Sequence, residues 1–176
     1  MNLSQNHFEL FGIPPRFRVD LARLDSRYRE LQREVHPDRF AAAPQSEQRA
    51  SMQLSTRVNE AYQTLKSPPG RAGYLLRLQG FDPEFETNTA MPASFLEEQL
   101  ELRESLEEAV KAGDALRLAT LSGQLGLQRE SLLAKLETEL DARQAWGEAA
   151  GTLRQLMFLE KFGEEIADAG EAMETR

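Results

Sequence analysis

The chain contains no cysteine, and this absence excludes disulfide bonds and metal sites built on thiolate ligands. It also lacks any apolar run near the roughly 20 residues that a helix needs to span a bilayer. Residues 1–13 show no basic segment followed by an apolar core, which is the pattern of a secretory signal peptide. From these absences we expect a cytoplasmic protein that does not enter a membrane.

β-Branched residues are sparse, and Leu, Glu, Ala, Arg and Gln dominate, which favours helix over strand. The net charge of −8 is unevenly spread. Residues 1–79 carry 12 Lys and Arg against 8 Asp and Glu, a balance of +4, whereas residues 80–176 carry 9 against 21, a balance of −12. This asymmetry indicates two modules with different partners. Nucleic acid is a weak alternative, because the arginines of the first half alternate with acids and no stacking aromatics accompany them.

The first half predicts two long helices flanked by short ones. A short helix over residues 7–11 is ended by Gly12 and the prolines after it. Asp20 is a good N-cap for a helix that must end near His36, because Pro37 disfavours helix in the residue before it. The apolar face of this helix steps by three and four residues through Leu21, Leu24, Tyr28, Leu31 and Val35.

After a polar loop, a second long helix is expected from about residue 45 to residue 67. Its apolar face consists of Leu54, Val58, Ala61, Tyr62 and Leu65. Pro68, Pro69 and Gly70 are expected to end it, and a shorter helix follows over residues 71–78. Two long amphipathic helices joined by a loop usually pack antiparallel, so we expect an antiparallel pair covered by the short helices.

Residues 80–91 contain turn residues without periodicity and are read as a linker. Three further helices are expected over residues 92–112, from about 115 to 142, and 146–169, with a break at Gly113-Asp114. They would form a three-helix bundle over residues 92–170, and the polar residues 171–176 are expected to fray as a tail. The expected fold class is therefore all-α, in two domains.

The tripeptide His36-Pro37-Asp38 stands at the end of the first long helix. By its residue types alone, a His and an Asp two residues apart could be a metal pair or an acid–base pair, as in a metal-dependent hydrolase. The other histidine of the chain is His7, so a three-ligand metal site would need carboxylates from distant segments. An exposed loop at a helix end is the plainer interpretation.

Three segments in order give the tripeptide a context. Residues 28–40 (YRELQREVHPDRF) resemble the J-domain signature, residues 59–68 (NEAYQTLKSP) resemble the following helix of that family, and residues 8–12 (FELFG) resemble its opening helix. The resemblance implies a J-domain over residues 1–79, with no catalytic site of its own. It also implies that the tripeptide contacts a DnaK-type chaperone and promotes the chaperone's ATP hydrolysis.

The chemistry of the tripeptide suits such a contact. A loop held by a rigid scaffold is a good recognition element, and Pro37 restricts it before binding. Asp38 can accept charge-assisted hydrogen bonds from a partner arginine, and His36 can donate one. Nearby arginines would steer encounter with an acidic surface, although each could equally be a solvated surface residue. The expected chaperone-binding residues are His36, Pro37, Asp38, Arg23, Arg27, Arg29, Arg33 and Arg39.

Two more segments narrow the resemblance. Residues 69–76 (PGRAGYLL) and 95–104 (FLEEQLELRE) are similar to the HscB family, the J-proteins of iron–sulfur cluster assembly. The similarity covers nearly the whole chain and weakens between about residues 116 and 145. It implies a C-terminal three-helix bundle and two partners: an HscA-like chaperone of the DnaK type and an IscU-like scaffold on which clusters are built. No cofactor, no metal and no nucleic acid are expected on this chain, and a J-protein with a different client remains an alternative.

The bundle helix over residues 92–112 carries a second hint. Phe95, Leu102, Leu106 and Ala109 lie within a narrow arc at ~100° per residue, and form the expected core stripe. Leu96 and Leu100 project roughly 100–140° away from its centre, and Phe158 lies roughly 140° from Leu153 on the last helix. Such residues could pack against the J-domain or widen the core, or they could form a binding patch rimmed by acids.

The HscB resemblance favours the binding patch. The scaffold-binding residues that it implies are Leu96, Leu100, Glu101, Glu104 and Phe158. Glu97 stands where relatives often have another apolar residue, which makes the apolar surface of this chain smaller.

Overall fold

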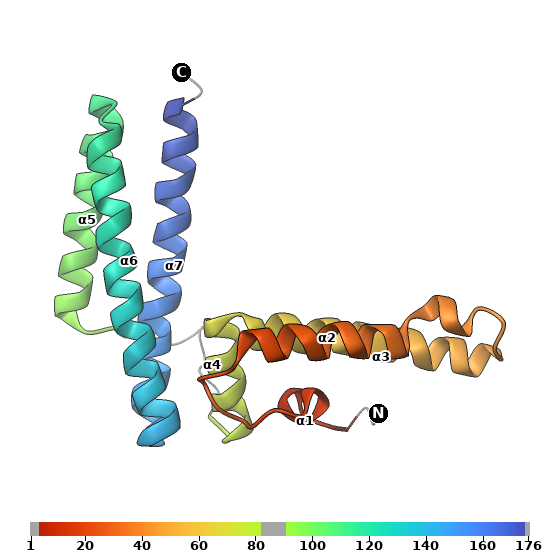
Figure 1. Ribbon diagram of the computed structural model, residues 1–176. Helices are drawn as coiled ribbons and strands as arrows, with labels where there is room; N and C mark the ends of the chain where they lie inside the picture. Colours follow the sequence, from red (N-terminus) through yellow and green to blue (C-terminus); the bar gives the residue numbers. More distant parts are fainter. Residues whose placement is uncertain (1–3, 82–90, 175–176) are drawn as a thin grey trace. The chain divides into compact units, whose positions relative to one another are not determined.

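The computed structural model describes residues 4–81 and 91–174. The chain divides into two compact units between Leu78 and Gln79. Every regular element in the described residues is a helix, which confirms the expected all-α class (Figure 1). None of these helices combines the length and apolar character needed to cross a bilayer. Most of the linker expected at residues 80–91 lies outside the described residues.

The first unit is built on an antiparallel helix pair. Its elements are α1 (His7–Phe11), α2 (Leu21–Val35), the 3₁₀ turn η1 (Pro37–Phe40), α3 (Gln45–Lys66) and α4 (Pro68–Leu78). Along α2 and α3, the Tyr62 hydroxyl donates to Asp25 at 2.8 Å, and the Ser51 hydroxyl donates to the Val35 carbonyl at 2.7 Å. From Asp25 to Val35 the residue numbers rise along α2, whereas their partners on α3 fall from Tyr62 to Ser51. The two helices therefore run in opposite directions, as expected (Figure 1).

Local signals explain where these helices begin and end. The Asp20 side chain accepts a hydrogen bond from the Arg23 amide and caps α2. Asn6 and Glu9 form a capping box on α1, and Gly12 ends this helix in the left-handed region at φ 62°. The apolar faces of α2 and α3 then meet in a core that includes the fully buried residues Leu24, Val58, Ala61 and Leu65.

Helix α4 begins earlier than expected. The sequence interpretation used Pro68, Pro69 and Gly70 only to end the preceding helix, but these residues form the first turn of α4. Proline is tolerated there because the first amides of a helix have no intrahelical acceptor. The break falls instead at Ser67, whose backbone is extended at ψ 123°. This short connection carries α3 directly into α4.

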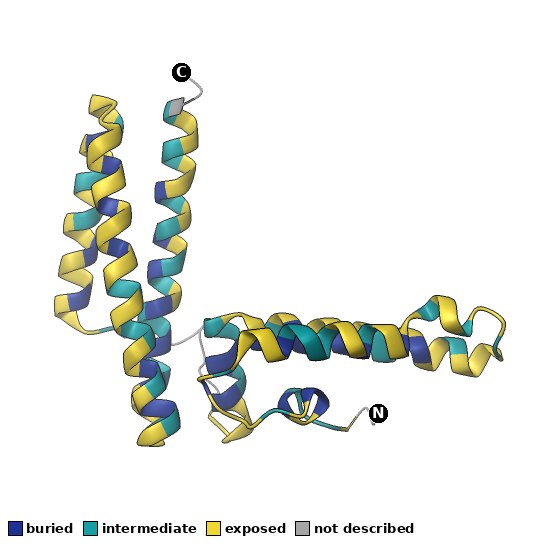
Figure 2. Cartoon of the chain, viewed as in Figure 1, coloured by how far each residue is buried: buried dark blue, intermediate teal, exposed yellow. Residues whose placement is uncertain are grey.

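The second unit is an up-down-up bundle. It contains α5 (Ala93–Ala112), α6 (Ala115–Glu137), the π-helical turn η2 (Thr138–Ala142) and α7 (Trp146–Glu174). Their buried faces meet in one core, seen as the buried stripes of Figure 2. The buried members of this core are Phe95, Leu118, Leu121, Leu125, Leu159, Phe162 and Ile166.

Helix α7 continues beyond the expected end near Ala169. It runs through Gly170 to Glu174, so the start of the predicted tail at residues 171–176 is helical. The reason lies in packing: Met173 packs against the bundle core, and a Cβ built on Gly170 would lie 3.4 Å from Leu118 Cδ2. Glycine at this position lets α7 stay close to α6 for another turn, so tertiary contact outweighs the polar composition of the segment.

His7 is a structural residue of the first unit. Its ring stacks on Tyr74 at 4.1 Å between centroids, and its amide donates to the Tyr74 hydroxyl at 3.0 Å. Burial, and then the charge of Arg57, lower the His7 pKa below its ordinary value of 6.5, although Glu60 acts in the opposite direction. The folded unit therefore favours the neutral imidazole.

We expect this unit to lose stability as the pH falls from above about 6.5 through the lowered pKa of His7. The unfolded chain takes up the proton first, so protonation favours unfolding over that window. Urea unfolding at about pH 7.5 and about pH 5.5 would show a smaller drop for His7→Gln than for the unaltered chain. Equal drops would mean that His7 does not contribute to the pH dependence.

Candidate functional site

The tripeptide forms the corner at which α2 ends. His36 has an extended backbone, with φ −60° and ψ 127°, and Pro37 occupies the first position of η1. The Asp38 amide donates to His36 Nδ1 at 3.3 Å, and the Arg39 amide donates to the His36 carbonyl at 3.0 Å. Local hydrogen bonds therefore fix the backbone of the corner and turn the side chains outward.

The side chains of the tripeptide are accessible. The His36 side chain is 51% exposed and that of Asp38 is 90% exposed, and His36 Nδ1 lies 3.5 Å from Asp38 Oδ2. A shallow hollow of about 470 Å³ beside them is lined by Gln32, Arg33, His36 and Arg39. Such a corner can present one acceptor and one donor to a partner without unfolding any part of the unit.

Two residues of the following helix hold the loop, and the sequence interpretation missed both. Ser51 is 3% exposed, and its hydroxyl donates to the Val35 carbonyl. Val35 is the last residue of α2, so its carbonyl has no amide donor within that helix. The Gln48 side chain donates through Nε2 to the carbonyls of Ala41 and Ala43 at 3.2 and 2.9 Å. No sequence pattern points to these contacts, because the partner carbonyls are main-chain groups: the loop fold brings Ala41 and Ala43 near Gln48, and the antiparallel pairing brings Val35 near Ser51.

The five arginines near the tripeptide do not share one face. At ~100° per residue, Arg23 and Arg27 lie ~40° apart, but Arg29 is ~200° from Arg27. Arg27 is ion-paired with Glu30, and Arg23 donates to the Gly12 carbonyl at 3.4 Å. Arg29 and Arg33, ~40° apart, form a second pair on the solvent side.

Arg39 belongs with the solvent-side pair. Its guanidinium donates to the Arg33 carbonyl at 3.0 Å, where α2 runs out of intrahelical donors. This contact places a second cation, beside Arg33, at the hollow that His36 lines, and Arg29 lies one turn before Arg33 on the same face of α2. The cationic surface next to the tripeptide is therefore made by Arg29, Arg33 and Arg39.

On the bundle, Leu96 and Leu100 are exposed by 45% and 60%. Glu104 follows Leu100 by one turn and is also exposed. Glu101 lies ~100° from Leu100 on the other side of the helix, where it lines a separate hollow with Gln124 and Gln128 of α6. The structure thus brings Leu96, Leu100 and Glu104 together and leaves Glu101 at the edge.

The ~140° offset from Leu153 predicts that Phe158 lies outside the core, but the structure places it partly inside. It is half-buried, and its ring meets Phe95 edge-on, with the centroids 5.9 Å apart and the planes at 75°. The reason is that the buried face of α7 turns along the helix: Leu153 and Phe162 are both 0% exposed although they point ~180° apart. Helix α7 packs against α6, η2 and α5, and its contacts with α5 include Phe158 and Glu165.

Arg103 is a member of this region that the sequence interpretation did not include. Its guanidinium carbon lies 5.3 Å from the Phe158 centroid and 5.6 Å from that of Phe162. Its Nη2 lies 3.3 Å from Glu165 Oε1. The signal was available, because Arg103 follows Leu96 by seven residues and Leu100 by three, which puts all three on one helix face.

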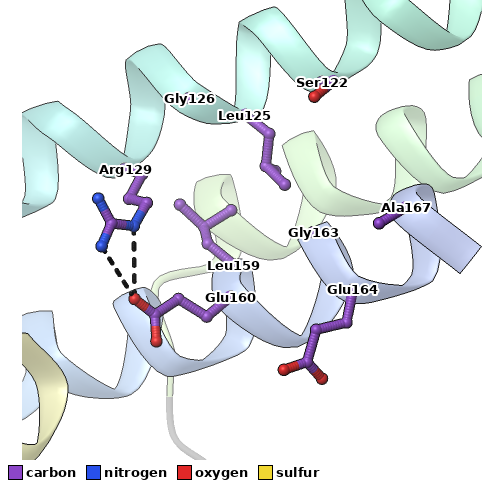
Figure 3. A pocket seen from close by; sticks show the side chains of 9 residues that line it. All are labelled: Ser122, Leu125, Gly126, Arg129, Leu159, Glu160, Gly163, Glu164 and Ala167. Atoms are coloured by element: carbon purple, nitrogen blue, oxygen red, sulfur yellow. Dashed lines mark hydrogen bonds and ion pairs between the residues drawn. The ribbon is translucent and has the colours of Figure 1, made fainter. Parts of the chain in front are cut away.

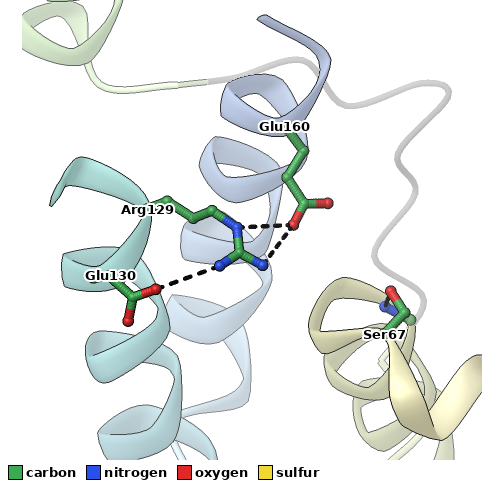
Figure 4. A network of polar contacts seen from close by, with 5 residues as sticks. Ser67, Arg129, Glu130 and Glu160 are labelled. Atoms are coloured by element: carbon green, nitrogen blue, oxygen red, sulfur yellow. Dashed lines mark hydrogen bonds and ion pairs between the residues drawn. The ribbon is translucent and has the colours of Figure 1, made fainter. Parts of the chain in front are cut away.

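A separate hollow of about 370 Å³ lies between α6 and α7 (Figure 3). Leu125 and Leu159 contribute its apolar lining, and Gly163 lets the two helices approach, since a Cβ there would lie 3.3 Å from Leu125 Cδ2. At one end Arg129 reaches Glu160 through Nε and Nη2, at 3.4 and 3.3 Å (Figure 4). The lining contains none of the residues expected to bind a partner. We attribute the hollow to the packing of α6 against α7.

A search of the described residues finds no three His, Asp or Glu side chains close enough together to hold a metal ion. His36 is at the end of α2, whereas the ring of His7 stacks on Tyr74 of α4. The pair that suggested metal-dependent hydrolysis, His36 and Asp38, is thus an exposed pair on one corner.

Comparison with known proteins places these features in a family. Residues 91–167 match the family model described as the HSCB C-terminal oligomerisation domain. A co-chaperone protein HscB homolog from Aromatoleum aromaticum is 49% identical over 175 residues, which cover 99% of each chain. Chaperone HscB from Vibrio cholerae is 37% identical with a TM-score of 0.84, covering 96% of this chain and 99% of that one. Human co-chaperone HscB is 32% identical with a TM-score of 0.88, covering 95% and 83%.

The support beneath the tripeptide can be tested at Ser51. We expect Ser51→Ala to lower the unfolding free energy of the first unit by about 1–3 kcal/mol, because it leaves the Val35 carbonyl without its buried donor. Amide exchange of residues 36–41 should become faster. Ser55→Ala, one turn along α3, is the matched control and should change stability by less than about 0.5 kcal/mol. Equal losses from the two variants would contradict this role of Ser51.

Proposed function

Because the chain belongs to the HscB family of co-chaperones, we propose that it binds an HscA-like chaperone of the DnaK type and stimulates its ATPase. We further propose that it delivers an IscU-like iron–sulfur scaffold protein to that chaperone. The observation that carries the first part is the exposed and internally braced corner at His36-Pro37-Asp38. The chain supplies contacts to both partners and no catalytic group, and it works in the cytoplasm.

The chaperone contact uses the tripeptide and the cations beside it. Asp38 accepts hydrogen bonds from a basic group of the chaperone, and His36 donates one. Arg29, Arg33 and Arg39 face an acidic surface directly and raise the rate of encounter. Arg27 contributes less because its charge is already paired with Glu30, and Arg23 lies on the same side of α2 as Arg27, away from Arg29 and Arg33. The braced loop loses little conformational freedom on binding, which favours affinity.

The scaffold contact uses the apolar patch on the bundle, which we define as Leu96, Leu100 and the exposed edge of Phe158. The two leucines are exposed and lie one turn apart on one face of α5, which is the pattern of a contiguous interaction surface. The more exposed Leu116 and Leu127 of α6 are three turns apart and do not form such a pair. Glu104 borders the patch and Glu101 lies further round the helix, so a partner with basic side chains around an apolar centre suits it. Glu97 adds charge where an apolar residue would enlarge the patch.

Joining both contacts in one chain gives the mechanism. A scaffold held by the second unit is tethered to the chaperone that the first unit engages, which raises its effective concentration at the chaperone's substrate site. ATP hydrolysis, triggered at the tripeptide, then traps the client. The chaperone cycle that follows assists transfer of the cluster from the scaffold.

The first test is steady-state ATP hydrolysis by HscA with this protein and IscU, added separately and together. We expect the greatest stimulation with both present, and loss of stimulation with His36→Gln or Asp38→Asn. Asp38→Asn should keep the unfolding free energy within about 0.5 kcal/mol, because the side chain is 90% exposed.

Asp168→Asn, at an exposed carboxylate of α7, is the control and should stimulate normally. Stimulation that IscU does not increase would keep the co-chaperone role and point to a different client. Full stimulation by both tripeptide variants would remove the assignment of the corner.

The second test is scaffold binding by calorimetry. Leu100→Ala should weaken binding of IscU about tenfold, because it removes an exposed anchor from the patch. Leu116→Ala on α6, where the side chain is 79% exposed, matches the change away from the patch and should bind as the unaltered chain does. Stimulation of HscA without IscU should be unchanged in both. Equal affinities of the two variants would contradict this placement of the patch.

A further inference from the structure

One face of α5 carries more than the two leucines. Leu96, Leu100, Arg103 and Glu107 follow one another by four, three and four residues, so they lie within ~60° of arc. All four are exposed, and the Arg103 side chain is 44% accessible. A cation is therefore continuous with the apolar patch, whereas Glu101 is not.

Arg103 is held in place before any partner arrives. Its guanidinium lies near the rings of Phe158 and Phe162, at 5.3 and 5.6 Å, and is paired with Glu165 at 3.3 Å. Phe162 is fully buried, and Phe158 meets Phe95 of the core edge-on. Aromatic and ionic contacts thus connect the guanidinium to the rigid interior of the bundle. A pre-organised arginine at an apolar surface loses little freedom when it binds.

The guanidinium retains donors for a partner. It has five N–H groups in a fixed fork, and its ion pair with Glu165 is made through Nη2. Its neighbours on α5 are the exposed acids Glu104 and Glu107, with Glu97 near Leu96. Lys111 pairs with Glu107 at 3.4 Å. With Arg103 and Lys111 counted against Glu97, Glu104, Glu107 and Glu165, this surface is still net negative, so it repels an incoming carboxylate but not an uncharged acceptor.

We infer that Arg103 determines the orientation of the scaffold by donating hydrogen bonds to a main-chain carbonyl at the edge of the contact made by Leu96 and Leu100. This inference rests on the proposed scaffold-binding function. The partner surface that fits has an apolar centre, a carbonyl exposed beside it, and basic side chains facing the glutamates. Arg103 is then a contact residue for the scaffold and not only a bridge between α5 and α7.

The test compares two variants that break the same internal ion pair. Arg103→Gln removes the guanidinium, whereas Glu165→Gln leaves it on the two rings. In calorimetry with IscU, Arg103→Gln should weaken binding about 10- to 100-fold, and Glu165→Gln should stay within about threefold of the unaltered chain. Arg103→Lys, which keeps the charge without the planar fork, should also lose affinity. Thermal unfolding should shift more for Arg103→Gln than for Glu165→Gln, because only the former also removes the contacts with the two rings.

Each other outcome is decisive. Equal weakening by Arg103→Gln and Glu165→Gln would mean that Arg103 acts only through the fold, and unaltered binding by Arg103→Gln would remove the contact. A loss in Arg103→Gln that vanishes at high salt would indicate a carboxylate partner and overturn the carbonyl assignment.

If the unaltered chain fails to bind IscU, the proposed function fails with the inference. If it binds through Leu100 but not through Arg103, only the inference fails.

Discussion

Pro37 is the constraint on which the first unit depends. Its ring excludes helical backbone at His36, so α2 must end at Val35 and the chain must leave the helix axis. Ending a helix leaves carbonyls without donors, and here Ser51 and Arg39 supply them, to Val35 and Arg33. Because other residues donate to these carbonyls, the Asp38 side chain is not needed to hold the fold, and the His36 side chain contributes only its Nδ1 acceptor to the corner. They remain exposed on a corner that is nevertheless fixed.

The bundle shows a related arrangement on a different scaffold. The buried face of α7 shifts along the helix, so that Leu153 and Phe162 are both buried although they point ~180° apart. That shift brings Phe158 to the junction with α5, where one side of its ring meets the core and another meets Arg103. A core residue thereby becomes part of an outer surface. An exposed group that packs against it, such as the Arg103 guanidinium, is therefore held by the core.

Periodicity predicted the long helices well, because apolar spacing reports directly which face of a helix is buried. It failed where two local rules compete or where the answer depends on a neighbour. Pro68 and Pro69 can either end one helix or begin the next, and only the packing of α4 decides between them. Phe158 needed knowledge of which helix lies beside α7, and Ser51 needed the position of a distant carbonyl. Arg103 could have been found from its spacing alone.

The division of charge between the two units bears on how the proposed adaptor would keep its two proposed partners from competing for one surface. The first half has a balance of +4 and the second of −12, from 12 and 9 cations against 8 and 21 acids. Complementary fields suppress wrong partners as well as attract right ones, so an acidic chaperone surface is repelled by the bundle and a basic client rim by the first unit. Each partner is thus directed to its own unit, and the two do not compete. A covalent tether can then raise local concentration to the millimolar range without either surface changing shape. In the proposed adaptor, cooperation between chaperone and scaffold therefore requires only two rigid and oppositely charged surfaces on one chain.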